Sequence, residues 1–214
     1  MELTKFGHAC VRLEKDGKIL VIDPGAFSEE SALDAADAVL ITHEHFDHME
    51  PERLRAAARA NPELTIWTCD AVAGQLSEAE VPAKIQAVRH GDAFETAGFR
   101  VRAVGELHAV NHPDVPQVQN VGFFVDDAVF YPGDALTPPG ADVHTLLVPT
   151  GAPWLKLAEM INYLRQVRPE HAYSTHDALY SEVGLKLVDN WLGMEADKQK
   201  ADLRRLELGD SVTV

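Results

Sequence analysis

One segment of the sequence constrains the fold more than any other, because an apolar run ends directly in a cluster of metal-binding side chains. Residues 38–42, Ala-Val-Leu-Ile-Thr, form a short continuous run, which predicts a strand buried on both faces. The motif His43-Glu44-His45-Phe46-Asp47-His48 follows at once. It is therefore expected on a loop at the end of a strand, where layered α/β folds tend to carry functional residues.

The spacing within the motif favours an extended backbone. His43, His45 and Asp47 occupy alternate positions, so an extended segment directs them to one side and turns His48 to another, whereas a helix would scatter them. Chance is expected to produce this pattern only about 0.002 times in a chain of this length and composition. The pattern therefore indicates a metal site rather than an ordinary polar loop.

Strands and helices are expected along the whole chain. Further strands are predicted at residues 3–6, 9–14, 18–22, 64–68, 84–88, 99–105, 121–126, 128–131, 143–149 and 171–174. Helices are predicted at 51–60, 155–167 and 181–198. This order predicts an α/β fold in which two mixed sheets pack face to face with helices outside, a four-layer αββα sandwich. No linker interrupts the 214 residues, so a single domain over 1–214 is expected.

The charge of the chain narrows the range of partners. Its formal net charge of -15 disfavours nucleic acid and anionic membranes, because both are bound by clustered Lys and Arg. The first residues lack the features of a secretory signal, and no apolar run reaches transmembrane length. The expectation is a cytoplasmic protein that acts on a small molecule. Cys10 and Cys69 are expected to be reduced packing residues.

Short motifs in a characteristic order carry a resemblance to a known family. They are Gly7-His8-Ala9-Cys10, Ile22-Asp23-Pro24-Gly25, Leu40-Ile41-Thr42-His43, Tyr131-Pro132-Gly133-Asp134 and Pro149-Thr150-Gly151-Ala152-Pro153-Trp154. With them, the sequence resembles the metallo-β-lactamase superfamily over nearly its whole length. It is similar to the small, lid-poor hydrolases that resemble ascorbate-6-phosphate lactonase. The resemblance implies the αββα fold and a metal-dependent hydrolase.

The resemblance also implies a complete set of ligands for two metal ions. One ion would be held by His43, His45 and a third histidine downstream, which corresponds to His108. The second ion would be held by Asp47, His48 and a C-terminal histidine, which corresponds to His176. Asp134 matches the carboxylate that bridges both ions in the family.

Some of these assignments have alternatives within the sequence. His112 lies four residues beyond His108, but His108 directly follows a predicted strand and is favoured as the ligand, which leaves His112 as a pocket residue. Asp23 is expected to orient a ligand histidine. His8 and Trp154 are further candidates for residues that support or line the metal site. The remaining histidines carry no specific pattern and are expected to be structural: His90, His144 and His171.

The ligand types predict the chemistry. Imidazoles and carboxylates suit two divalent ions, of which zinc is the first expectation, while Mn²⁺ and Fe²⁺ fit the same ligands. A bridging hydroxide would attack an ester, lactone, amide or phosphodiester, with Asp47 and Asp134 as catalytic carboxylates and Asp47 as a proton acceptor. The backbone of residues 149–154 could receive an anionic group of the substrate. Two other hypotheses stay open: a mono-iron or other redox enzyme, and a catalytically silent metal-binding scaffold.

Overall fold

The computed structural model describes all 214 residues, which form two seven-stranded sheets. The first has the order β14-β1-β2-β3-β4-β5-β6 and consists of Glu2–Lys5 (β1), Val11–Lys15 (β2), Lys18–Ile22 (β3), Ala38–Ile41 (β4), Thr65–Thr68 (β5), Lys84–Ala87 (β6) and Ser211–Thr213 (β14). The second has the order β13-β12-β11-β10-β9-β8-β7 and consists of Ala93–Thr96 (β7), Phe99–Val104 (β8), Gly122–Val125 (β9), Val129–Tyr131 (β10), Thr145–Pro149 (β11), His171–Thr175 (β12) and Asp202–Arg204 (β13).

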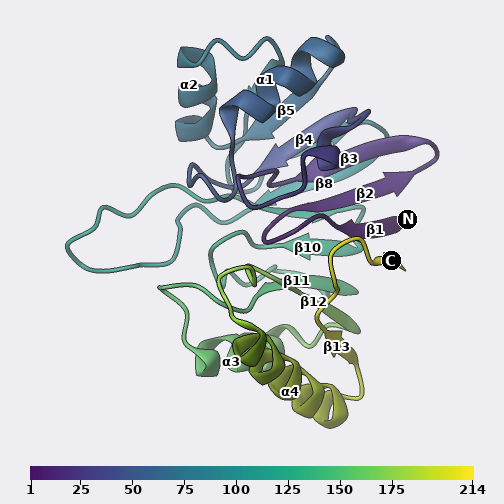
Figure 1. The fold of residues 1–214 in the computed structure, drawn as a ribbon, viewed down its shortest axis with the longest axis vertical. Helices are drawn as coiled ribbons and strands as arrows, with labels where there is room; N and C mark the ends of the chain where they lie inside the picture. Colours follow the sequence, from purple (N-terminus) through teal and green to yellow (C-terminus); the bar gives the residue numbers. More distant parts are fainter.

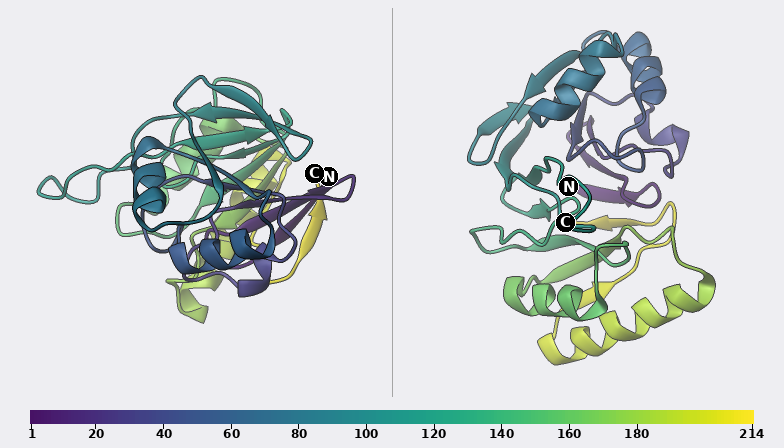
Figure 2. Two further views of the ribbon diagram at one scale, coloured as in Figure 1. Left: turned by 90° about the horizontal axis from the view of Figure 1, so that it is seen from above. Right: turned by 90° about the vertical axis from the view of Figure 1, so that its left-hand side faces the viewer.

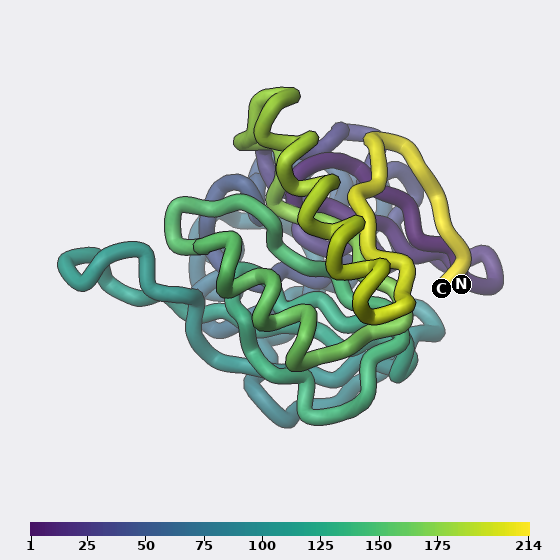
Figure 3. The backbone as a smooth tube through the Cα atoms, turned by 90° about the horizontal axis from the view of Figure 1, so that it is seen from below, coloured from purple at the N-terminus to yellow at the C-terminus, as the bar shows by residue number.

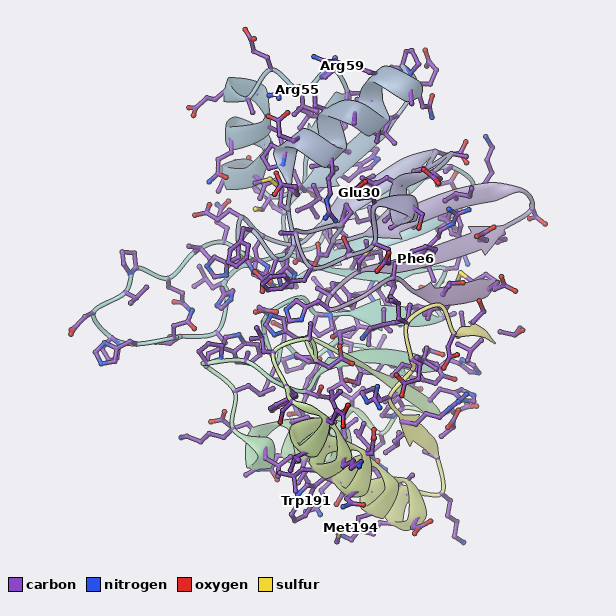
Figure 4. The ribbon with its side chains drawn as sticks, viewed as in Figure 1. Phe6, Glu30, Arg55, Arg59, Trp191 and Met194 are labelled. Carbon is purple, nitrogen blue, oxygen red and sulfur yellow. The ribbon has the colours of Figure 1, made fainter.

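The helices cover the two outer faces of this pair of sheets. Pro51–Ala60 (α1) and Asp70–Glu78 (α2) lie beyond the first sheet, and Leu157–Val167 (α3) and Glu182–Gln199 (α4) lie beyond the second (Figure 1). Helices α1 and α4 therefore lie at opposite ends of the molecule. Figure 4 labels Arg55 and Arg59 on α1, and Trp191 and Met194 on α4. The prediction of a four-layer αββα sandwich with two mixed sheets is confirmed.

The strands form where the sequence is most apolar. All residues of β4, β9 and β11 are buried, as expected for strands covered on both faces. The larger core cluster joins the two sheets with α1 and α2, and a smaller one joins the second sheet to α3 and α4. Because apolar burial is the main stabilising term, these two clusters hold the four layers together.

The sequence did not predict several elements, and each of them has a weak secondary-structure pattern. Helix α2, the short 3₁₀ helix Glu30–Leu33 and the edge strands β7, β13 and β14 were not expected. Helix α2 contains a glycine, which disfavours helix, and β13 and β14 have only three residues each. Helix α3 begins at Leu157 rather than at residue 155. These elements depend on tertiary pairing, which a local pattern does not reveal.

The parallel parts of both sheets place their carboxyl ends along one edge of the sandwich. Strands β3 to β6 run parallel in the first sheet, and β10 to β13 run parallel in the second. The loops that follow β3, β4, β10, β11 and β12 therefore gather at one place, here called the metal edge. A long loop of residues 105–121 between β8 and β9 projects far from the body on this side (Figure 2).

The two ends of the chain lie beside each other (Figure 3). Strand β1 pairs with β14 in antiparallel register, and the terminal amine of Met1 donates to the carbonyl of Val214 at 2.7 Å. The last strand therefore covers β1 and becomes the edge strand of the first sheet itself; it has only three residues, and short edge strands limit edge-to-edge association. None of the helices combines the length and apolar character needed to cross a bilayer.

One buried hydroxyl ties the two sheets together. The Tyr131 hydroxyl on β10 donates to the Ala9 carbonyl, just before β2, at 3.0 Å. We expect Tyr131→Phe to lower the free energy of unfolding by about 1–3 kcal/mol, because it leaves a buried carbonyl without a partner. Urea denaturation measures the change. Tyr173→Phe is the control, because the Tyr173 hydroxyl bonds to the half-exposed Asp202 and should cost less; equal losses for both variants would contradict the prediction.

Candidate metal centre

The metal edge brings together all seven residues predicted as ligands. They come from four loops that follow strands of both sheets, and they are His43, His45, Asp47, His48, His108, Asp134 and His176. Five of the seven are buried: His43, His48, His108, Asp134 and His176. His45 and Asp47 are partly exposed, so the cluster opens to solvent on their side.

One group of three imidazoles lies at the end of β4 and the base of the projecting loop. Ligand atoms of His43, His45 and His108 lie within 4.8 Å of one another. His43 Nε2 and His45 Nδ1 are 3.1 Å apart, which directs both nitrogens to one point. His112 is not part of the cluster, because its side chain is 63% exposed beside Asp114. The structure therefore places His108, rather than His112, next to the motif.

Asp134 lies between this group and the remaining ligands. One of its oxygens, Oδ2, is 3.3 Å from His108 Nε2 and 3.1 Å from His176 Nε2. The other, Oδ1, is 3.2 Å from His48 Nε2. Asp47 Oδ2 lies 3.3 Å from His176 Nε2. A carboxylate in this central position can contact two cations at once.

The outward nitrogens of the buried imidazoles are held by the protein. His48 Nδ1 lies 2.7 Å from Asp23 Oδ2, His108 Nδ1 lies 2.5 Å from the Ala109 carbonyl, and His176 Nδ1 lies 2.6 Å from the Gly151 carbonyl. Carbonyl oxygens only accept, so the Nδ1 atoms of His108 and His176 carry the hydrogen. In the neutral rings, the Nε2 atoms then carry lone pairs that face the cluster, as metal-binding imidazoles require.

His43 is fixed in the same way through Thr42. The Thr42 hydroxyl donates to Asp23 Oδ2 at 2.6 Å, so its oxygen is free to accept from His43 Nδ1 at 2.9 Å. Asp23, which is completely buried, also accepts from the Thr42 amide at 2.7 Å. A single carboxylate thus orients two of the ligand histidines, one directly and one through a hydroxyl.

The cluster contains the unpartnered atoms that a metal site requires. His48 Nε2, His108 Nε2, His176 Nε2 and Asp134 Oδ1 are buried and have no hydrogen-bond partner. Buried polar atoms of this kind are rare because each costs free energy, and here they share one location. Divalent cations would satisfy all of them, so the residues fit a metal centre well.

The pKa values of the clustered side chains also favour bound cations. Burial opposes the charged form of His48, but the neighbouring carboxylates raise its pKa well above the ordinary value. Burial likewise opposes charge on His176, yet the nearby carboxylates of Asp134 and Asp47 raise its pKa to about 9. Burial disfavours the charged form of Asp134, but His48 and other imidazoles lower its pKa well below the ordinary value. The carboxylates thus create a demand for positive charge that bound cations would meet.

His8 supports Asp47 from outside the ligand set. The Ala178 amide donates to His8 Nδ1 at 3.2 Å, so the hydrogen of the neutral ring is on Nε2, which lies 3.2 Å from Asp47 Oδ2. Burial disfavours the charged form of Asp47, but the neighbouring imidazoles of His176 and His8 lower its pKa far below the ordinary value. His8 therefore keeps Asp47 ionised and oriented.

Some contacts of the site carry no signal in the sequence. The Trp154 indole donates to Asp134 Oδ2 at 2.9 Å, and the Asp134 amide donates to the side chain of Asn120 at 3.0 Å. Trp154 was a candidate, but Asn120 and Thr42 were not identified. Thr42 could have been noticed because it directly precedes the motif, whereas Asn120 lies in no recognisable pattern.

A close backbone contact fixes the motif loop. A methyl group at Gly25 would lie 2.0 Å from the carbonyl carbon and oxygen of Asp47. We expect Gly25→Ala to displace the motif and lower zinc affinity at least about tenfold, since ligand positions tolerate only small shifts. Competitive titration with a chromogenic chelator measures this. Gly74→Ala in α2 is the control, because its methyl group meets no atom within 4 Å; unchanged zinc affinity in Gly25→Ala would contradict the expectation.

Comparisons with known proteins show which families and folds the chain resembles. The sequence model of a family described as "Beta-lactamase superfamily domain" matches residues 2–176. Protein Rv0786c of Mycobacterium tuberculosis is 39% identical over 185 residues, which cover 84% of this chain and 85% of the relative. A UPF0173 metal-dependent hydrolase of Salinibacter ruber is 30% identical over 175 residues, 71% of this chain and 73% of the relative. The structure of Igni18, a metallo hydrolase from Ignicoccus hospitalis, is similar in fold, with a TM-score of 0.72, 20% identity and coverage of 100% and 97% of the two chains.

Proposed function

This chain belongs to the metallo-β-lactamase superfamily, and from that premise we propose that it is a hydrolase with two divalent metal ions. His43, His45 and His108 would hold one ion, and Asp47, His48 and His176 would hold the other. Asp134 would bridge the two, because its oxygens face ligands of both groups. Zinc is the proposed metal, and Mn²⁺ or Fe²⁺ suit the same donors.

One observation carries this proposal above the others. Four buried ligand atoms on three histidines and one aspartate have no hydrogen-bond partner and face one point. A fold that had lost its metal ions would have no reason to keep such costly atoms unpaired. The set also consists of imidazoles and carboxylates, so it suits hydrolytic metals better than soft, thiolate-binding ones.

When bound, the metal pair supplies a water with a lowered pKa and a Lewis acid for the attacked carbonyl or phosphoryl oxygen. The protein's own residues control what reaches that point. Asp47 is the more exposed of the two carboxylates, with a side chain that is 13% exposed compared with 4% for Asp134, so it can pass a proton to solvent or to the leaving group. Trp154 and Asn120 fix Asp134 and leave it a ligand only.

The reaction proposed is hydrolysis of an ester, lactone, amide or phosphodiester. One water adds across the scissile bond, so that an ester gives a carboxylic acid and an alcohol. Metal analysis combined with an assay panel tests the proposal. We expect at least two ions per chain, and activity toward at least one of a lactone, an aryl ester and bis-p-nitrophenyl phosphate that disappears on treatment with a chelator and returns with zinc.

Two outcomes would overturn the proposal. Stoichiometric iron together with oxygen consumption would assign the chain to redox chemistry. Equal, low turnover by zinc-loaded wild type and by His43→Ala across the panel would indicate a binding protein without hydrolytic activity. One ion per chain would remove Asp134 from its bridging role and leave a mononuclear hydrolase.

A further inference from the structure

The exposed apolar side chains of the protein are concentrated around the metal edge. Eleven large apolar residues are exposed in the whole chain. Four of them lie in loops of this edge, Phe27, Phe46, Leu179 and Tyr180, and three more lie in the projecting loop on the same side, Leu107, Val110 and Val115. Phe46 is 61% exposed within the ligand motif itself. Exposed apolar groups that gather in one place mark a binding surface.

Two of these rings connect the motif to a cavity. The rings of Phe46 and Phe27 meet edge to face with centroids 5.3 Å apart, and Phe27 meets His8 in the same way at 5.4 Å. Phe27 and His8 also line a cavity of about 300 Å³. The apolar residues of its wall are Phe27, Ala178, Tyr180, Leu185, Leu206 and Leu208. His8 thus separates this cavity from Asp47.

The two cations that line the cavity are already paired, and the remaining charged group of its wall, Glu29, is an anion. Lys5 is buried and pairs with Asp177 at 3.1 Å, while Arg205 pairs with Asp189 at 3.2 Å and with Glu207 at 2.8 Å. Neither cation is left to hold an anionic substrate, and the whole chain carries a net charge of -15. A substrate with an uncharged, apolar part fits these surroundings better than a phosphate ester does.

We propose that the cavity beside His8 binds the apolar acyl part of the substrate, so that the enzyme hydrolyses carboxylic esters, lactones or amides of medium-chain acids. This inference rests on the proposed function, because the metal centre must lie where the carbonyl is attacked. The chain would run from the metals past Phe46 and Phe27 into the cavity. Tyr180 would cover it on the side of α4.

Binding of hydroxamates tests this without turnover. Hydroxamates chelate divalent metals, so acetohydroxamate and octanohydroxamate share a head group and differ in the chain. We expect octanohydroxamate to bind zinc-loaded protein at least tenfold more tightly in isothermal titration, since each buried methylene adds roughly fourfold. Leu185→Trp, which fills the cavity from α4, should reduce the difference to about twofold and leave the acetohydroxamate affinity unchanged.

A matched control lies on the same helix. Leu187 is 54% exposed on α4 and does not line the cavity, so Leu187→Trp should preserve the preference for the longer chain. Phe27→Ser is a second test variant in case Leu185→Trp fails to fold, and it should also weaken the preference. Circular dichroism verifies the fold of each variant.

Three results would overturn the inference. Equal affinity for the two hydroxamates would mean that the cavity beside His8 does not bind an acyl chain, while the metal centre would remain supported. A dimer in gel filtration that dissociates in Phe46→Ser would show that a second copy covers the edge. Failure of both hydroxamates to bind zinc-loaded protein would overturn the proposed metal centre and the acyl pocket together.

A different group of side chains lies in the second sheet at the strand ends opposite to the metal edge. Ligand atoms of His144, Glu170 and His171 lie within 4.8 Å of one another where the parallel strands β11 and β12 begin. The His171 amide donates to the His144 carbonyl at 2.9 Å, which fixes the two backbones side by side. His144 Nδ1 bonds to Thr145, and His144 Nε2 lies 3.7 Å from Glu170. His171 Nδ1 is buried without a hydrogen bond and has Asp202 Oδ2 3.6 Å away.

We infer that these three residues form a separate site for a divalent first-row metal ion. Two imidazoles and one carboxylate are donors that zinc, nickel and copper prefer, and water would complete the coordination. The sequence pattern had suggested only structural roles for His144 and His171. An ion here would bridge β11 and β12 at the end remote from the metal edge.

Metal counting separates this site from the catalytic one. At saturating zinc, wild type should hold one ion more per chain than His144→Ala or Glu170→Gln, with unchanged hydroxamate binding in both variants. His112→Ala, which alters an exposed histidine outside both clusters, should hold as much zinc as wild type. Equal zinc content in wild type, His144→Ala and Glu170→Gln would overturn the inference.

Discussion

Asp134→Asn is expected to lower kcat/KM by about a thousandfold or more, the largest effect of any single substitution in this protein. The replacement keeps the size of the side chain and an oxygen for the Trp154 indole, but it removes the charge that faces His48, His108 and His176. The variant should also hold at least one ion per chain fewer than wild type in elemental analysis. Steady-state kinetics and metal content, measured on the same preparation, check both parts.

Asp127→Asn is the control for this substitution. It makes the same chemical change in a hairpin turn, at a side chain that is 72% exposed, and activity should stay within about twofold of wild type. Asp134→Asn protein with the metal content of wild type and near-normal activity would show that this carboxylate bridges nothing.

The second large effect is expected at Asp23, which touches no metal. Asp23→Asn should weaken zinc binding by about 10- to 100-fold, because the carboxylate orients His48 directly and His43 through Thr42. It should also lower the free energy of unfolding of the metal-free protein by about 1–3 kcal/mol, because an amide cannot accept from all three buried donors. Chelator competition and urea denaturation measure the two effects.

Asp16→Asn provides a close control. Asp16 and Asp23 both have left-handed backbones, with φ of 53° and 49°, which asparagine also adopts. Asp16 lies exposed in the turn between β2 and β3, so its replacement should change neither zinc affinity nor stability measurably. Wild-type affinity in Asp23→Asn would mean that Thr42 and the backbone alone orient the histidines.

Much of the fold could be predicted because its central strands are strongly patterned. The run at residues 38–42 predicts β4, and Asp16-Gly17 and Asp126-Asp127 mark two hairpins that the structure contains. Helix α1 begins and ends where its proline and alanine-rich sequence predict. Elements at the edges, such as β7 and β14, were missed because neighbouring strands stabilise them rather than their own residues.

The candidate site was also only partly predictable from the sequence. The motif around His43 shows itself by spacing alone, and the resemblance to the superfamily supplied Asp134 and His176 as ligands. The hydrogen-bond acceptors behind the histidines could not be predicted, because two of them are backbone carbonyls, of Ala109 and Gly151. Every residue has a carbonyl, so only the folded chain shows which ones are used.

The division of the ligands between two sheets has a consequence for the life of the protein in a cell. Motif residues come from the first sheet, while Asp134 and His176 come from the second, so the proposed ligands would bind metal ions tightly only when the halves are docked. Such binding lowers the population of open, protease-sensitive chains by mass action. Cells short of the metal would therefore degrade this protein faster, and its abundance would follow the metal supply even where transcription is constant.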